Sequence, residues 1–148
     1  MKKIKLNIQI NCKNYNIIPK KKIKQWIYSV IKKKCEITIR IVNILEIKKL
    51  NFIYRKKKEP TNILSFPFER PKHIKSTFLG DLVICLKIIQ KESKLQKKTI
   101  EAHLAHIIIH GTLHLIGYTH DNFYNAQIMQ SIEIKNMIQL GYKNPYLI

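Results

Sequence analysis

The amino-acid sequence predicts an α+β fold in which helices pack on one mixed β-sheet. Two segments, 4–10 and 36–42, alternate apolar and polar residues, as half-buried strands do. Several longer segments repeat apolar residues every three or four positions, which is the spacing of amphipathic helices. The predicted order is β-α-β-α-β-β-α-α-α, and it favours a single sheet covered by helices. Residues 1–148 are enough for one domain with its own core.

Two helices are predicted in the first third of the chain, each after one of these strands. The first begins at Pro19, because proline suits the first turn of a helix. Its apolar side consists of Ile23, Trp26, Ile27, Val30 and Ile31. The second covers residues 43–55, where apolar residues recur every three positions, and Pro60 then breaks the pattern.

The rest of the chain is predicted to contain two strands and three helices. The strands are 62–68 and 79–86, separated by a loop with Pro71. The first predicted helix covers 87–97 and has a polar face. The second covers 99–116 and is apolar on nearly every side apart from its histidines. The third covers 122–140 and is closed by Gly141.

The formal net charge of +19 favours a polyanionic partner such as nucleic acid or an anionic membrane surface. Only three of the 28 basic residues are arginine, however, and isoleucine and asparagine are abundant. This composition is typical of a bias toward A- and T-rich codons, which raises lysine whatever the function. The charge therefore permits RNA binding without establishing it.

The cysteines Cys12, Cys35 and Cys85 are far apart and form no CxxC pair, which favours a reducing compartment. The basic N-terminus has no continuous apolar core of the signal-peptide type. No segment approaches the roughly 20 apolar residues of a membrane span. We therefore expect a cytoplasmic protein with no membrane segment.

The histidines predict a metal site. Burying an imidazole is costly unless its nitrogens find partners. His110 and His114 are four residues apart, so they share a helix face and can both reach one zinc ion. His106 lies about 12 Å from His114 along the helix axis, so the third ligand should come from outside the helix. Gly117 is expected to end the helix and turn the chain so that His120 completes the site.

Three histidine ligands leave a fourth position open, as in catalytic zinc sites. Metalloproteases of the HExxH type place a glutamate after the first ligand, whereas this chain has Gly111, which argues against peptide hydrolysis by that route. We expect this glycine to leave room beside the metal. His103 and His106 are predicted to be core residues, with contact to a metal ligand as the alternative for His106.

The segment HGTLHLIGYTH (110–120) resembles the HGxLHLxGYDH signature of the YbeY family, the bacterial rRNA maturation factors. Other segments agree with the family in the expected order. These are YRKKKEPTNILSFPF (54–68), LGDLVIC (79–85), EAHLAHIIIHG (101–111) and LGYKNPY (140–146).

The resemblance implies one α+β domain with a zincin-like metal-binding helix. It also implies single-strand-specific endoribonuclease activity in rRNA processing, at the 3′ end of the small-subunit RNA, and a role in ribosome quality control, with small-subunit proteins as further partners. One Zn²⁺ would be held by His110, His114 and His120. The functional arginine of the family corresponds to Arg55, and we expect Arg55 and His114 to be catalytic.

One position departs from the family, which usually has Asp where this chain has Thr119; Asp121 could take over its role as a partner of a metal ligand. No general base is obvious, although Asp81 is a candidate base or ligand partner, with a strand-end cap as the alternative. The aromatic residues Phe66, Phe68 and Phe78 are expected to pack in the core rather than to stack on bases. Two other functions stay open, namely a non-catalytic RNA-binding assembly factor with a structural metal and a metal hydrolase of another substrate.

Overall fold

The computed structural model describes residues 3–13, 18–73 and 75–147. The strands are β1 (Ile4–Asn11), β2 (Cys35–Val42), β3 (Ile63–Pro67) and β4 (Phe78–Ile84). The helices are α1 (Lys20–Val30), α2 (Ile44–Arg55), α3 (Leu86–Leu95), α4 (Ile100–Leu115) and α5 (Phe123–Gln139). This order confirms the predicted one, and the element boundaries differ from the prediction by only a few residues.

The four strands form one mixed sheet in the order β1-β2-β4-β3. The first three strands in this order are parallel, and β3 pairs with β4 in the antiparallel direction. The predicted mixed sheet is therefore confirmed. Because β3 is an edge strand, its outer side is free to border a cleft.

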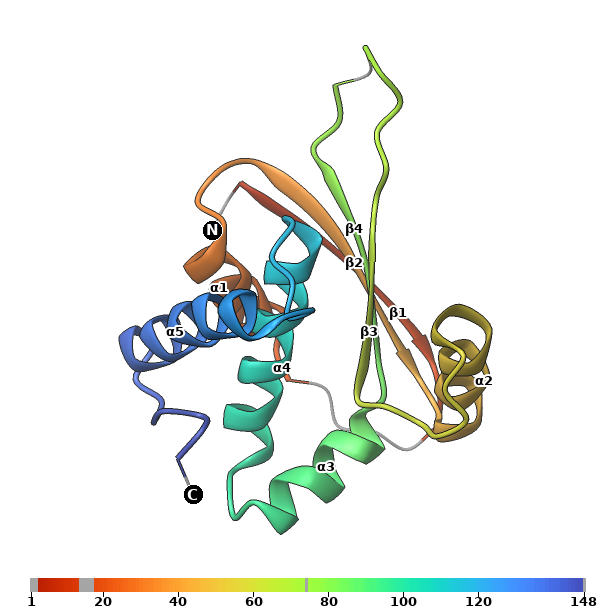
Figure 1. The fold of residues 1–148 in the computed structure, drawn as a ribbon, viewed down its shortest axis with the longest axis vertical. Coiled ribbons are helices and arrows are strands. Elements are labelled where there is room, and N and C mark those ends of the chain that lie inside the picture. The colour runs from red at the N-terminus through yellow and green to blue at the C-terminus, as the bar shows by residue number, and fades with distance from the viewer. Residues whose placement is uncertain (1–2, 14–17, 74, 148) are drawn as a thin grey trace.

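Helices cover the two faces of the sheet unequally (Figure 1). Ile37, Ile39 and Ile41 of β2 point to the face on which α1 and α4 pack, and they belong to the main core. Ile47 of α2 packs on the opposite face in a smaller apolar cluster that includes Leu64 and Val83. Helix α4 contacts α1, α3, α5 and the sheet, which explains why its sequence is apolar on nearly every side.

Side-chain caps fix where three of the helices begin. Asn43, Thr99 and Asn122 each accept a hydrogen bond from the backbone N–H three residues later, which satisfies a donor that the helix leaves unpaired. Thr99 in this way sets the start of α4, the helix that carries most of the histidines.

The connection between β3 and β4 projects beyond the rest of the molecule (Figure 1). At its base the rings of Phe68 and Phe78 meet edge to face, with centroids 5.3 Å apart. Within the parts of the chain that the structure describes, no helix combines the length and apolarity needed to cross a membrane.

Candidate metal centre

The structure brings the three predicted ligands together. His110 and His114 lie one turn apart near the C-terminal end of α4, and His120 follows in the turn toward α5. One nitrogen from each ring lies within 4.8 Å of the other two. The Nε2 atoms of His110 and His114 are 3.1 Å apart. Two tetrahedral ligands with bonds of about 2.0–2.1 Å to one zinc would be about 3.3 Å apart, so the spacing fits a shared ion.

Hydrogen bonds leave both of these Nε2 atoms available to a metal. His114 donates from Nδ1–H to the carbonyl oxygen of Tyr118, at 2.9 Å. His110 donates from Nδ1–H to the carboxylate of Glu133, at 3.3 Å. In the neutral form of both rings, which is the form that binds metal, each Nε2 then carries a lone pair. Two lone pairs facing each other at 3.1 Å repel unless a cation lies between them. This donor set fits a divalent metal ion.

The pKa of His114 agrees with this assignment. Burial, followed by the neighbouring His110, lowers the pKa of the His114 imidazole to about 4. The ring is therefore neutral at neutral pH, which is the form that binds metal.

The turn after α4 returns His120 to the site, as predicted. Gly117 adopts φ 105°, a backbone conformation that glycine adopts without strain. Its N–H donates to the His114 carbonyl, and the N–H of Tyr118 donates to the Leu113 carbonyl, which together form a Schellman motif. The ring of His120 then stacks on that of His110, with centroids 5.3 Å apart.

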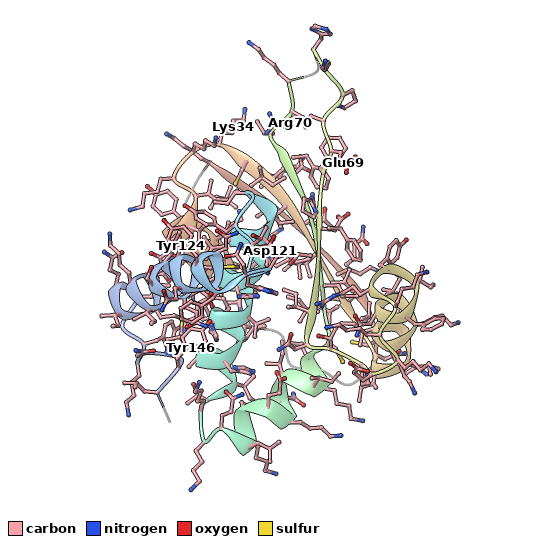
Figure 2. All side chains as sticks on the ribbon, in the orientation of Figure 1. Lys34, Glu69, Arg70, Asp121, Tyr124 and Tyr146 are labelled. Carbon is pink, nitrogen blue, oxygen red and sulfur yellow. The ribbon has the colours of Figure 1, made fainter. Side chains whose placement is uncertain are left out.

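Thr119 and Asp121 stabilise this turn rather than a ligand. The Thr119 hydroxyl donates to Asp121 Oδ1 at 2.9 Å, and the Asn125 amide donates to the same oxygen at 3.0 Å. These bonds, that of Asn125 first, lower the pKa of Asp121. Figure 2 shows Asp121 at this corner between α4 and α5. Within the described chain the only carboxylate hydrogen-bonded to a predicted ligand is Glu133.

Glu133 of α5 is the residue that the sequence analysis missed. Its side chain is 1% exposed, and the carboxylate accepts hydrogen bonds from His106 Nε2 at 2.5 Å and from the Tyr146 hydroxyl at 2.7 Å, besides that from His110. Burial alone would raise the pKa of Glu133, but these hydrogen bonds outweigh it and hold the pKa at about 2. The sequence did contain an indication of this role, because Glu133 is an acidic residue on the same buried face of α5 as Met129 and Met137.

The other two histidines of α4 lie outside this cluster. His103 is buried, as predicted, and its Nε2 lies 2.9 Å from Glu92 Oε1 on α3, so it ties two helices together. His106 is half-buried and lines the cleft, and its ring meets that of His110 edge to face with centroids 6.4 Å apart. Its Nε2 bonds Glu133, the partner of His110, which matches the alternative considered for it.

A cleft of about 760 Å³ between β3 and α4 contains the three predicted ligands. Arg55, the last residue of α2, also lines it and is exposed. None of the described residues that line the cleft is acidic. The Arg55 guanidinium therefore meets the cleft with no carboxylate there to neutralise it.

Two expectations need correction. Asp81 does not line the cleft, because it lies on β4 between Gly80 and Leu82, and Leu82 points to the α4 face. Asp81 therefore lies on the opposite face of the sheet, where burial raises the pKa of its carboxyl.

Gly111 does not leave room beside the metal, because it faces the sheet. A Cβ there would lie 2.7 Å from Ile63 Cδ1 and 2.9 Å from Leu82 Cδ2, so the glycine lets α4 approach the sheet.

Comparisons with known proteins agree with the fold and the site. The family described as Endoribonuclease YbeY matches residues 7–141. A relative named Endoribonuclease YbeY, from Buchnera aphidicola subsp. Acyrthosiphon pisum (strain APS), is 55% identical over all of this chain and 98% of its own length. The solution structure of TM1509 from Thermotoga maritima is 25% identical with a TM-score of 0.62, covering 90% of this chain and 88% of that one. The chain therefore belongs to the YbeY endoribonuclease family.

Proposed function

We propose that this protein is a metal-dependent endoribonuclease that cleaves single-stranded RNA in the cleft between β3 and α4. Its substrate is ribosomal RNA, which it cleaves at the 3′ end of the small-subunit RNA. It acts in the cytoplasm, in ribosome maturation and quality control. Proteins of the small subunit are further partners. Membership of the YbeY family supports the reaction class. The net charge of +19 supports a polyanionic substrate, and three free cysteines support a reducing compartment.

The observation that carries the proposal is the pair of facing Nε2 atoms of His110 and His114, 3.1 Å apart, with both Nδ1 atoms donating elsewhere. Together with His120 they would hold one Zn²⁺ and leave a fourth position open to the cleft. A cation bound there supplies charge that polarises a phosphoryl oxygen and lowers the pKa of water.

The protein's own groups would orient the substrate. The Arg55 guanidinium can pair with a phosphate through two parallel hydrogen bonds, and it has no carboxylate competitor in the cleft. Its planar fork would fix the scissile phosphate relative to the histidines and stabilise the charge that develops on it. The His114 ring is neutral at neutral pH. Glu133 and the Tyr118 carbonyl hold the rings of His110 and His114 in orientation.

The test is cleavage of a single-stranded RNA spanning the small-subunit 3′ end, with purified wild type beside His114→Ala prepared identically. The proposal expects cleavage that requires added metal and disappears in the variant, which also excludes a contaminating nuclease. If the wild type binds Zn²⁺ and RNA but cleaves no better than His114→Ala, the nuclease proposal is wrong.

A further inference from the structure

A second hollow, of about 510 Å³, lies beside α1 at the end of the sheet where β1 and β2 begin, and it shares no lining residue with the metal cleft. Five of its 11 lining residues are lysines, namely Lys3, Lys5, Lys20, Lys24 and Lys34. The metal cleft, by contrast, has Arg55 as the one lysine or arginine among its described lining residues. We call the second hollow the lysine groove.

The fold gathers these lysines from three separate segments. Lys20 and Lys24 are four residues apart on α1 and so share a helix face. Lys3 and Lys5 are two residues apart at the start of β1. Lys34 precedes β2, and the backbone N–H of its neighbour Cys35 donates to the Lys3 carbonyl at 2.9 Å, which holds the two segments side by side. The groove is thus built by tertiary structure rather than by one lysine run.

The positive charge of the groove is not neutralised by the protein. Glu36 is the only acidic residue among the lining residues, and one of its oxygens already accepts a hydrogen bond from the Asn7 amide at 2.8 Å. Among the described residues, none of the five lysines forms an ion pair, whereas Lys22 on the same helix pairs with Glu101. Like charges gathered in a hollow attract and hold a polyanion.

The base of the β3–β4 hairpin connects the groove with the metal cleft. Pro67 lines the cleft and Thr77 lines the groove. The residues that follow them, Phe68 and Phe78, form the edge-to-face aromatic pair. Phe68 is 43% exposed, so it does not pack in the core as the sequence analysis expected. Exposed aromatic rings stack on unpaired bases. Figure 2 shows Lys34 at the same end of the molecule as the hairpin residue Arg70.

From this arrangement we propose that the lysine groove is a second RNA-binding surface, which holds the phosphate backbone of the single strand that leaves the metal cleft across the hairpin base. The inference rests on the proposed function, because it assumes that RNA occupies the cleft. It adds that the protein binds an RNA much longer than the segment it cleaves, and that affinity and cleavage depend on different surfaces.

The test compares two triple variants of equal charge. The groove variant is Lys5→Gln, Lys24→Gln and Lys34→Gln. The control is Lys48→Gln, Lys91→Gln and Lys94→Gln, which removes three exposed lysines from α2 and α3 that line neither hollow. Binding is measured as a function of salt for single-stranded RNAs of about 30 and about 6 nucleotides. A third variant, with the groove lysines changed to arginine, keeps the charge.

The groove variant is expected to bind the long RNA about tenfold or more weakly than the control. Its plot of log affinity against log salt should be shallower by about 2, since each phosphate that the groove no longer neutralises removes about 0.7 from the slope. The short RNA should bind the two variants equally, and the arginine variant should match the wild type.

Equal weakening of the long RNA by groove and control variants would overturn the inference, as would a groove variant with the wild-type salt slope. Binding is scored separately from cleavage, so a wild type that binds but does not cleave refutes only the proposed nuclease function.

Discussion

Glu133 is the one buried carboxylate in the described chain that bonds a predicted metal ligand. Its hydrogen bond to Nδ1 orients the His110 ring. We predict that Glu133→Gln weakens Zn²⁺ binding by about 10- to 100-fold, because an amide orients the His110 ring less firmly and does not raise its basicity. Competition with a chromogenic chelator measures this affinity.

Glu92→Gln is the matched control for this substitution. Glu92 likewise bonds a histidine of α4, but that histidine is His103, which lies outside the cluster of predicted ligands. The control should lose stability and keep its Zn²⁺ affinity. If both variants lose affinity equally, the effect of Glu133 is a general loosening of α4.

The same carboxylate should make stability depend on pH. The folded pKa of Glu133 is about 2, below its ordinary value of 4.5. A carboxyl with a depressed folded pKa stabilises the fold above about pH 4.5 and loses that contribution as pH falls toward 2. Metal-free wild type should therefore exceed Glu133→Gln by about 3 kcal/mol in free energy of unfolding at pH 6. Urea titrations should show this gap narrowing below pH 4.5, and a gap that stays constant to pH 3 would contradict the assignment.

Arg55 should matter for the reaction and not for the metal. We predict that Arg55→Gln lowers kcat by about 100-fold and that Arg55→Lys restores little of it, since a lysine cannot form two parallel bonds to a phosphate. Zn²⁺ affinity should stay unchanged in both. Lys94→Gln on α3, which lines neither the cleft nor the lysine groove, removes the same charge and serves as control. An equal loss of kcat there would show that only net charge matters.

Some residues of the site could be predicted from the local sequence, whereas others depend on how distant segments pack. His110, His114 and Gly117 were predictable because their roles follow from spacing along one helix and its end. Glu133 was not identified because its partner on α4 is more than 20 residues away and depends on how α5 packs. Gly111 was misjudged for the same reason, since only the packed sheet shows which way that face of α4 points.

At the scale of elements, Gly80 fixes how closely β4, β3 and α4 pack. It is buried with φ 145°, and a Cβ there would lie 2.3 Å from the Phe66 carbonyl oxygen. We predict that Gly80→Ala lowers the free energy of unfolding by about 3 kcal/mol, from backbone strain and overpacking together. Gly117→Ala is the control, because φ is also positive but a Cβ there meets nothing within 4 Å, so only about 1–2 kcal/mol should be lost. Urea denaturation measures the free energy of unfolding of both variants. If the two variants lose equal stability, the close contact of Gly80 with β3 does not contribute.

The elements themselves were largely predictable, whereas their arrangement was not. Alternation located β1 and β2, and apolar periodicity together with prolines and glycines bounded the helices. Nothing local to β3 shows that it lies at the edge of the sheet in the order β1-β2-β4-β3. That position follows from long-range pairing with β4, and it is what opens the cleft beside α4.

At the scale of the whole molecule, the metal centre lies outside the main core. The core cluster is formed by buried apolar residues of the sheet and of α1, α3, α4 and α5. Of the three predicted ligands, by contrast, His110 and His114 are only half-buried and His120 is exposed. The ion would join the end of α4 to the turn before α5, two parts that the Schellman motif already connects. A metal in such a place stabilises a fold that exists without it.

This arrangement predicts how metal removal will act. Zn²⁺ at 100 times its Kd adds about 2.7 kcal/mol through binding to the folded state alone, which for a chain of this size is about 5–10 °C in Tm. A chelator should therefore lower the Tm of the wild type by that amount, leave a cooperative unfolding transition and a native near-ultraviolet circular dichroism spectrum, and change nothing in His114→Ala. A structural metal, as in a non-catalytic assembly factor, would instead make the metal-free protein lose its tertiary structure. Calorimetry of both proteins with and without chelator separates the two, because only a metal that the fold does not require can be lost while the core remains intact.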